Sequence, residues 1–356
     1  MKKLITVMSA CVLMLVFGIV LTACGHTHEW GEWSTLTSPT CTTAGTEVRV
    51  CEHDKDHKET RDVSATGHTY GEAGVITAAT ESADGLYGKK CNGCSHAIET
   101  SVLYATGTEG LSYTLINDNA EYSVSRGTIT ENDAIDLHIP AYHKGGDGVY
   151  KPVTNIAISA FYIDSSKDFK IKSVTISATV KTVGNSAFRR CKSLKTVTFA
   201  EGSQLTTIDS SAFSSCYILE SIKIPDSVTL IDVSAFANDF MLTEINIPTG
   251  LTELKNDVFS NCGRDTESGM TSVVIPVGIT KIGDGVFRVI KGSEGLSGEE
   301  LEYIYYGGNA TEWGEVNISN TNNANLKGAT VLYYSETVIE DGWHYVNGVP
   351  TMWEVA

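Results

Sequence analysis

A short motif, Ala or Val followed by Phe, recurs through the middle of the chain. Successive phenylalanines are 27, 25, 23, 23 and 28 residues apart, so the unit is 23 residues with short insertions. They are Phe161, Phe188, Phe213, Phe236, Phe259 and Phe287. A unit this short cannot bury its own apolar side chains, and several units must therefore stack around one shared core. The repeat predicts a solenoid.

Each unit combines a short strand with a tight reversal of the chain. A clear example reads Ile222-Lys-Ile224-Pro225, then Val228, Ile231 and Ala235-Phe236. The alternating apolar pair predicts a strand, which the proline ends because it cannot donate a hydrogen bond to a ladder. The later apolar positions favour a turn and a short helical segment. We therefore expect an α/β solenoid of about seven coils with a 23-residue unit.

The flanking segments are expected to cap this solenoid, because an open end would expose apolar side chains. Residues 108–136 have the pattern of N-terminal cap strands, and residues 137–334 form the solenoid. Residues 335–356 are predicted to be an aromatic hairpin, since Asn347-Gly348 stands between two apolar runs.

The N-terminal part carries a second repeat, at an offset of 40 residues without a gap. The segment His28-Glu-Trp-Gly-Glu32 matches His68-Thr-Tyr-Gly-Glu72. Short runs that alternate with period two indicate strands. We expect two small β-rich modules, at residues 24–67 and 68–107.

Cysteine and histidine concentrate in these modules. Thiolate and imidazole are zinc ligands, and a turn such as Cys91-Asn-Gly-Cys94 can hold one metal ion. The candidate metal-binding or disulfide residues are Cys41, Cys51, His53, His57, Cys91, Cys94 and His96. Each module lacks a different ligand, because Asp54 stands at the position of Cys94 and Glu81 at that of Cys41. Zinc within residues 28–107, disulfides such as Cys41–Cys51, and free cysteines all stay open.

The solenoid repeat resembles the BspA-like leucine-rich repeat family of bacterial surface proteins. The resemblance rests on Ile-x-Ile-Pro, on Val-x-x-Ile-x-x-x-Ala-Phe, and on a cysteine three residues after the phenylalanine. It covers roughly residues 111–353, and the N-terminal modules are similar to repeats in secreted proteins of the same kind. It implies a surface protein that adheres to host proteins or to other cells. Ser177 and Ala200 replace the proline, and Asp239 replaces the cysteine.

Those cysteines are Cys191, Cys216 and Cys262. Because they share one phase of the repeat, we expect a column of small buried side chains in the core rather than a metal or redox site.

The first 23 residues have the order of a bacterial signal peptide. Lys2 and Lys3 precede a long uncharged apolar run, and Leu21-Thr-Ala-Cys24 resembles a lipobox. Residues 1–23 would then be removed and Cys24 would be the lipid attachment site that holds the chain at the membrane. An uncleaved transmembrane anchor is the alternative. Either arrangement places the remaining residues outside the cytoplasm.

Charge and motif content exclude several function classes. Lys and Arg number 26 against 43 Asp and Glu, and the formal net charge of −17 would repel a nucleic acid. The sequence contains no His-Glu-x-x-His, no Gly-x-Ser-x-Gly and no phosphate-binding loop. We therefore expect no enzyme activity, no nucleic-acid partner, and no cofactor other than the zinc considered above.

The exposed face of the stacked strands is the expected binding surface. The residue between the two buried strand positions faces solvent. From this row and its neighbour we select His138, Lys223, Asn246, Tyr303 and Tyr305. Aromatic anchors dominate binding energy, so the tyrosine end is favoured for a protein or glycan ligand. The alternatives are a structural surface scaffold without a ligand, and metal binding by the N-terminal modules.

Overall fold

The computed structural model describes residues 27–80, 83–130, 134–162, 170–266, 269–290 and 301–354. These residues form two compact units. One contains the described residues up to Glu72 together with Lys89–Ile98, and the other contains Ala73–Gly88 and the described residues from Glu99 onward. The predicted signal peptide and the lipid attachment site at Cys24 lie outside the described residues. Within the described ranges, no helix has the length and apolar character needed to cross a bilayer.

The two N-terminal modules are small three-stranded sheets, as their alternating runs predicted. The first has the order β1 (Ser34–Thr37), β2 (Gly45–Val50) and β3 (Lys58–Val63), with both pairings antiparallel. The second has the order β4 (Gly74–Thr77), β5 (Gly85–Lys90) and β6 (Ala97–Leu103). Their buried apolar side chains are few: Cys51, Cys91 and Ala105 among the described residues.

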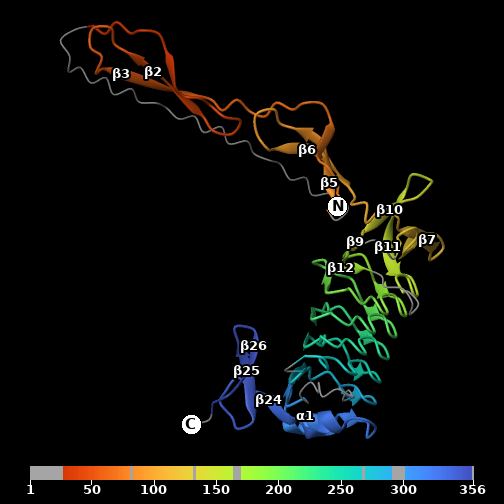
Figure 1. Ribbon diagram of the computed structural model, residues 1–356. Helices are drawn as coiled ribbons and strands as arrows, with labels where there is room; N and C mark the ends of the chain where they lie inside the picture. The colour runs from red at the N-terminus through yellow and green to blue at the C-terminus, as the bar shows by residue number, and fades with distance from the viewer. Residues whose placement is uncertain are drawn as a thin grey trace, which may run out of the picture. The chain divides into compact units, whose positions relative to one another are not determined.

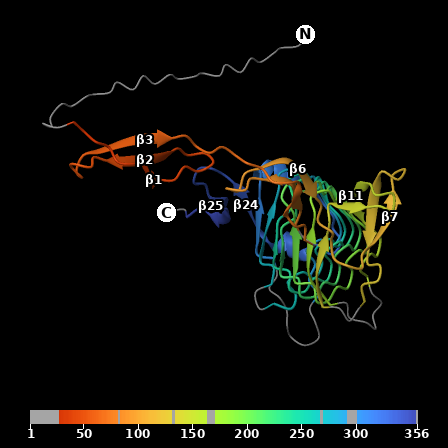
Figure 2. The ribbon, with the colours of Figure 1, turned by 90° about the horizontal axis from the view of Figure 1, so that it is seen from above.

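The solenoid contains two columns of parallel strands, visible as stacked coils in Figure 1 and along the stack in Figure 2. The first column carries the Ile-x-Ile segments, and its last strand continues into the C-terminal hairpin. It consists of β9 (Ile135–Ile139), β12 (Ile171–Ile176), β14 (Thr196–Phe199), β16 (Ser221–Ile222), β18 (Glu244–Ile245), β20 (Ser272–Ile275), β22 (Tyr303–Tyr306) and β24 (Thr330–Tyr334). This is the strand-rich leucine-rich repeat architecture that the sequence predicted.

The second column carries the shorter strands that follow in each coil. It consists of β11 (Tyr150–Ile156), β13 (Thr182–Val183), β15 (Thr207–Ile208), β17 (Leu230–Ile231), β19 (Glu253–Leu254), β21 (Lys281–Ile282) and β23 (Asn317–Ile318). Neighbours from β11 to β17 and from β19 to β23 pair in parallel, for example Thr182 with Thr207 and Thr207 with Leu230.

The Phe segments form a third column, made of hydrogen-bonded turns. Each phenylalanine amide donates to the carbonyl of the residue before the next phenylalanine, as from Phe188 to Ala212 at 2.7 Å. The rings stack in a ladder, and the centroids of Phe188 and Phe213 lie 5.2 Å apart. Successive coils are therefore joined by backbone hydrogen bonds and by a continuous aromatic column.

The helical segment expected beside each phenylalanine is not formed in the described coils. The residue two places before each phenylalanine has a positive φ between 52° and 59°, which interrupts any helix. These residues are Ser159, Ser186, Ser211, Ser234, Asp257 and Gly285, types that are small or polar. The helices among the described residues are α1 (Ala310–Glu315) and α2 (Ala324–Gly328).

The cysteine column lies in the core, as its phase predicted. Cys191, Cys216 and Cys262 are buried, and the Cys216 thiol lies 3.3 Å from the Phe188 carbonyl oxygen. Asp239 occupies the same position in its own coil and is fully buried. Its Oδ1 accepts a hydrogen bond from the Cys216 amide at 2.8 Å, while its Oδ2 has no hydrogen-bond partner. Burial raises the pKa of the Asp239 carboxyl well above its usual value.

A hairpin covers the N-terminal end of the solenoid. It comprises β7 (Ser112–Ile116) and β8 (Glu121–Ser125), and β8 pairs in parallel with β11. A further short strand, β10 (Tyr142–Lys144), pairs with the other end of β11.

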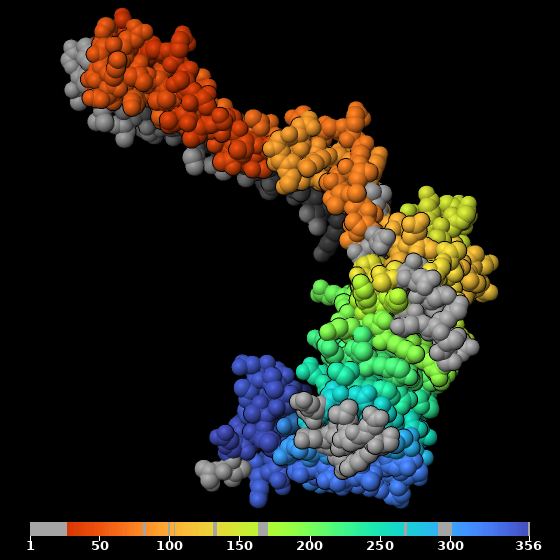
Figure 3. Space-filling model, in the orientation of Figure 1, coloured from red at the N-terminus to blue at the C-terminus, as the bar shows by residue number. Residues whose placement is uncertain are grey.

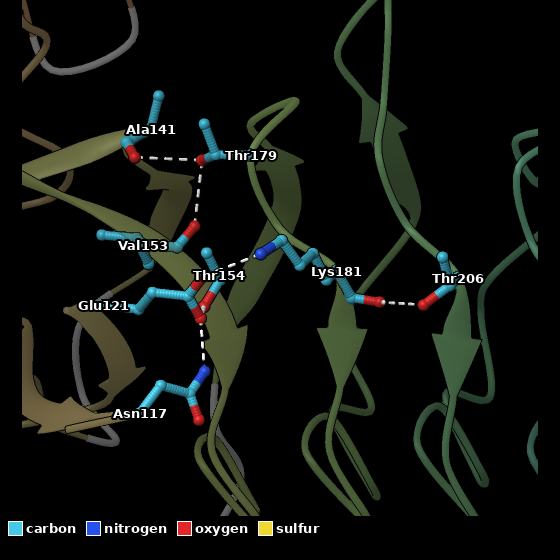
Figure 4. Close-up of polar contacts among 8 residues, drawn as sticks. All are labelled: Asn117, Glu121, Ala141, Val153, Thr154, Thr179, Lys181 and Thr206. Atoms are coloured by element: carbon cyan, nitrogen blue, oxygen red, sulfur yellow. Dashed lines mark hydrogen bonds and ion pairs between the residues drawn. The ribbon is translucent and has the colours of Figure 1, made fainter.

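Figure 4 shows how Glu121 joins this hairpin to the first coils. Its carboxylate accepts hydrogen bonds from Thr154 at 2.8 Å and from Lys181 at 2.7 Å. The contact with Lys181, followed by that with Thr154, lowers the pKa of Glu121.

The C-terminal hairpin extends the first column at the opposite end. It is formed by β25 (Gly342–Val346) and β26 (Val349–Met352), with β25 beside β24. Asn347 and Gly348 both have positive φ, at 52° and 81°, as the Asn-Gly signal predicted. The Trp343 side chain is buried, and its indole nitrogen donates to the Tyr306 carbonyl at 2.8 Å.

Candidate functional site

The strands of the first column align the sequence-selected residues in rows. His138 pairs with Thr175, which in turn pairs with Thr198. At the other end of the solenoid Val274 pairs with Tyr305, and Ser272 pairs with Tyr303. The predicted face therefore has a continuous strand register within each of three sheets, which are separated between β14 and β16 and between β18 and β20.

Two of the selected residues have structural contacts of their own. The Asn246 side chain accepts from the Ile224 amide at 2.6 Å and donates to the Ile224 carbonyl at 2.7 Å. The Asn246 side chain thus joins two coils by bonding the backbone amide and carbonyl of Ile224, the groups that a neighbouring strand would otherwise bond. His138 is half-buried at the N-terminal end. Its backbone amide donates to the Thr108 hydroxyl, and its carbonyl accepts from the Thr108 amide. Neither residue lies beside Tyr303 or Tyr305 in the strand register.

A hollow of about 450 Å³ lies on the C-terminal part of this face. Strands β16, β18 and β20 form its floor, and Tyr305 and Pro350 lie at its edge. The polar lining includes Ser221, Lys223, Glu244, Asn246 and Ser272. Figure 3 shows the C-terminal hairpin, in dark blue, beside these coils. Lys223, Asn246 and Tyr305 are therefore brought together, while His138 is not part of this site.

The hairpin contributes Pro350 to the lining of the hollow, a residue that sequence reasoning did not place in the site. Tyr345 lies directly opposite Pro350 in the hairpin register, so both side chains are on the same face of the hairpin. Tyr345 is 51% exposed and packs edge-on against Trp343, with ring centroids 5.0 Å apart. Tyr305 contacts the same tryptophan at 5.4 Å, and burial raises the pKa of the Tyr305 hydroxyl. The sequence signal for this hairpin was the alternation of apolar residues on either side of Asn347-Gly348.

The N-terminal modules contain a second cluster, made of Cys41, His68, Cys91 and Cys94. One ligand atom from each lies within 4.8 Å of all the others. The Cys41 and Cys91 sulfurs are 3.6 Å apart, and the Cys94 sulfur is 3.3 Å from His68 Nδ1. His68 was not selected from the sequence, although its match to His28 at the start of the other module was a usable signal.

The remaining candidates lie elsewhere. His53 contacts Glu29 at 3.1 Å, and His57 contacts Asp54 at 3.6 Å. Cys51 is buried in the first module, opposite Trp30.

His96 lies next to the cluster rather than in it. Its ring stacks on that of His68 with centroids 4.4 Å apart, and its Nδ1 is 2.8 Å from the Tyr70 hydroxyl.

The thiols of the cluster differ in acidity. The pKa of Cys91 is lowered to about 6, first by the Gly93 amide and then by His68. The pKa of Cys41 is raised to about 11, first by its hydrogen bond with Cys91. Neither Cys41 nor Cys51 is part of a disulfide in the structure, and the Cys41 sulfur faces that of Cys91.

The parallel coils and the phenylalanine ladder together define a leucine-rich repeat solenoid. A family model described as BspA type leucine rich repeat region matches residues 154–293 in 6 copies. This match confirms, over residues 154–293, the family resemblance that the repeat motif indicated. Proteins of the BspA type are typically surface proteins and generally serve as binding scaffolds.

Solved structures of similar proteins come from several bacteria. The T. pallidum leucine-rich repeat protein TpLRR is 22% identical with a TM-score of 0.44, covering 64% of this chain and 98% of that one. The pneumococcal vaccine antigen PcpA is 21% identical with a TM-score of 0.43, covering 70% of this chain and 53% of PcpA. A leucine-rich repeat protein from Bacteroides ovatus is 22% identical with a TM-score of 0.34, covering 64% and 70%. No curated protein matches the chain significantly.

Proposed function

We propose that the chain is a lipid-anchored surface protein that binds an extracellular protein or glycan along its strand face, in the manner of an adhesin. The hollow between the β16–β18–β20 floor and Pro350 carries this proposal, because it is concave and has both apolar and polar lining. Its position at the aromatic end of the face supports it further, since aromatic side chains are frequent binding anchors.

The side chains around the hollow suit a polar ligand with an apolar or ring-shaped part. Tyr305 at the hollow, and Tyr345 opposite Pro350 in the hairpin, offer amphipathic surfaces on which a sugar ring or an aromatic side chain can pack. Lys223 and Glu244 provide opposite charges on the floor of the hollow. The hydroxyl groups of Ser221 and Ser272 supply hydrogen bonds to the same ligand.

The test is binding of the purified full chain to arrays of extracellular matrix proteins and glycans. Tyr345→Ser should weaken binding about tenfold or more, because it removes an exposed aromatic anchor. Tyr150→Ser is the matched control, since Tyr150 is 43% exposed at the other end of the solenoid. Both variants should keep the melting temperature of the parent chain.

Two outcomes contradict this proposal. One is an equal loss of binding in both tyrosine variants. The other is no binding to any arrayed molecule; self-association of cells that display the chain would then support the surface-scaffold alternative.

Attachment at Cys24 is the second part of the proposal. The Cys24→Ala variant should be released from the membrane fraction, because it removes the residue that would carry the lipid. Metabolic labelling with a fatty acid should mark the parent chain and not the variant. Retention of the variant in the membrane fraction would instead support an uncleaved apolar anchor within residues 1–23.

A further inference from the structure

We propose that Cys41, His68, Cys91 and Cys94 form one zinc site, shared between the two N-terminal modules. This site is separate from the strand face and does not depend on the function proposed for it. Cys41 comes from the first repeat, and the other three residues come from the second. The proposal identifies which of the candidate cysteines and histidines act together, and it adds His68 to them.

The distances match a tetrahedral metal site. Zinc bonds of about 2.3 Å to sulfur and about 2.0 Å to nitrogen imply tetrahedral edges of about 3.8 Å between two sulfurs and about 3.5 Å between sulfur and nitrogen. The observed distances are 3.6 Å for Cys41–Cys91 and 3.3 Å for Cys94–His68. Since all four ligand atoms lie within 4.8 Å of one another, small side-chain movements bring them onto one ion.

The Cys91–Cys94 turn is built to receive a third sulfur. The Gly93 amide points at the Cys91 sulfur at 3.4 Å, a contact that stabilises a thiolate. A side chain on Gly93 would place its Cβ only 2.9 Å from the Cys41 sulfur. Glycine at this position therefore leaves the space into which Cys41 reaches.

Backbone hydrogen bonds hold the other ligands against this turn. The Asn92 amide donates to the Thr69 carbonyl at 2.9 Å, which fixes the segment carrying His68. The Thr66 amide donates to the Thr40 carbonyl at 2.9 Å, which fixes the loop carrying Cys41. Main-chain contacts thus bring the segments that carry the ligands together.

The environment of His68 also suits a metal ligand. Its Nδ1 faces the Cys94 sulfur, while its ring stacks on His96. His96 is in turn held by the Tyr70 hydroxyl at 2.8 Å. Contacts of this kind fix the orientation of a ligating imidazole.

A shared site explains why each repeat lacks a different ligand. In the first repeat the equivalent positions of His68, Cys91 and Cys94 are His28, Cys51 and Asp54. Asp54 contacts His57 there. Among the described residues, one group of three or more possible metal ligands lies close together, and it is the cluster of Cys41, His68, Cys91 and Cys94.

Three thiolates and one imidazole favour zinc over calcium or magnesium, which prefer oxygen ligands. A disulfide between Cys41 and Cys91 would instead require their sulfurs to approach from 3.6 Å to about 2.0 Å. That disulfide would not account for the proximity of Cys94 and His68.

The experiment measures zinc bound to the purified full chain by native mass spectrometry and elemental analysis, after titration with Zn²⁺ alone. We expect one zinc ion per chain in the parent protein and none in Cys41→Ser or Cys94→Ser. Cys51→Ser is the matched control, because Cys51 is the buried counterpart of Cys91, and it should keep the ion. Cys41→His should restore binding, which separates loss of a ligand from loss of folding.

Cobalt provides a second measurement on the same variants. The Co²⁺-loaded parent chain should show thiolate-to-metal absorption, and Cys41→His should shift it as one sulfur is replaced by nitrogen. The proposal is overturned if the parent chain binds no zinc, if Cys41→Ser keeps it, or if Cys41 and Cys91 form a disulfide that resists alkylation.

Discussion

The N-terminal modules and the solenoid differ sharply in how much hydrophobic core they contain. In the solenoid, one continuous cluster runs from Tyr122 to Leu326 and includes the stacked phenylalanines. In the modules, strand β3 is exposed along nearly its whole length, and only a few apolar side chains are buried. Sequences of about 40 residues rarely fold on their own without a disulfide, a metal or a partner. The comparison shows why cysteine has a separate role in each region.

In the solenoid, cysteine is a small apolar side chain within a column. Cys191, Cys216 and Cys262 belong to the continuous core, and each thiol lies against a backbone carbonyl oxygen. In the modules, Cys51 and Cys91 are two of the few buried apolar side chains. A metal shared by two repeats would stabilise residues that have little apolar surface to bury.

The largest effect should follow removal of zinc. With EDTA, the modules should lose their structure, because they have little core to hold them. Limited proteolysis followed by mass spectrometry should show new cleavage within residues 27–107 and continued protection of the coils. Cleavage that is the same with and without EDTA would contradict the distinction drawn between the two regions.

Next in size is a cavity in the phenylalanine ladder. Phe213→Ala should reduce the free energy of unfolding by about 3–5 kcal/mol, because Phe213 is fully buried between two stacked rings. Urea unfolding followed by circular dichroism measures this change. Tyr150→Ala, at an exposed position, should change it by less than about 0.5 kcal/mol. A small effect of Phe213→Ala would show that the coils do not share one core.

A smaller gain in stability is expected when the cysteine column is completed. Asp239→Cys should stabilise the chain by about 1–2 kcal/mol near neutral pH, because it removes a buried carboxyl oxygen that has no partner. The new thiol can face the Phe213 carbonyl, as the Cys216 thiol faces that of Phe188.

The same variant tests the direction of a pH effect. Since the pKa of Asp239 is raised in the folded state, its favourable contribution is complete below the ordinary aspartate pKa and is lost as pH rises through the folded-state value. Thermal melts of the parent chain should therefore fall with rising pH more steeply than those of Asp239→Cys. Parallel pH profiles would contradict this assignment.

The smallest effect concerns the N-terminal cap. Glu121→Gln should cost less than about 1 kcal/mol, since it weakens a partly exposed contact with Lys181. The lowered pKa of Glu121 means that its contribution is present above the ordinary glutamate pKa and is lost as pH falls through the folded-state value. Glu220→Gln is the control, because its contact with Lys195 is more exposed. Hydrogen exchange of β7 and β8 should rise only in the first variant.

Local sequence patterns predicted much of this fold. The spacing of the phenylalanines gave the coil length, because each coil must return its apolar residues to the same core. Alternation around Ile222 and Ile245 located strands β16 and β18, and Asn347-Gly348 located the turn of the final hairpin. The helix expected beside each phenylalanine was wrong, because a left-handed residue such as Ser186 follows from the closure of the coil and has no strong local signal.

The candidate sites were less predictable for the same reason. Lys223 and Tyr305 were found from their phase in the repeat, but Pro350 reaches the same hollow only because the hairpin folds beside the coils. The spacing of Cys91 and Cys94 marked a possible metal turn. It did not reveal that the third sulfur comes from Cys41, which is 50 residues earlier in the chain.

The sequence by itself determined the repeat, its family and the identity of the residues available for binding. These properties depend on patterns within one or two units, and such patterns can be read locally. The tertiary structure decided which distant residues meet: Pro350 with the strand face, and Cys41 with His68, Cys91 and Cys94. Such contacts depend on how the loops close and on which backbone groups pair between distant segments. No short window of the sequence contains that information.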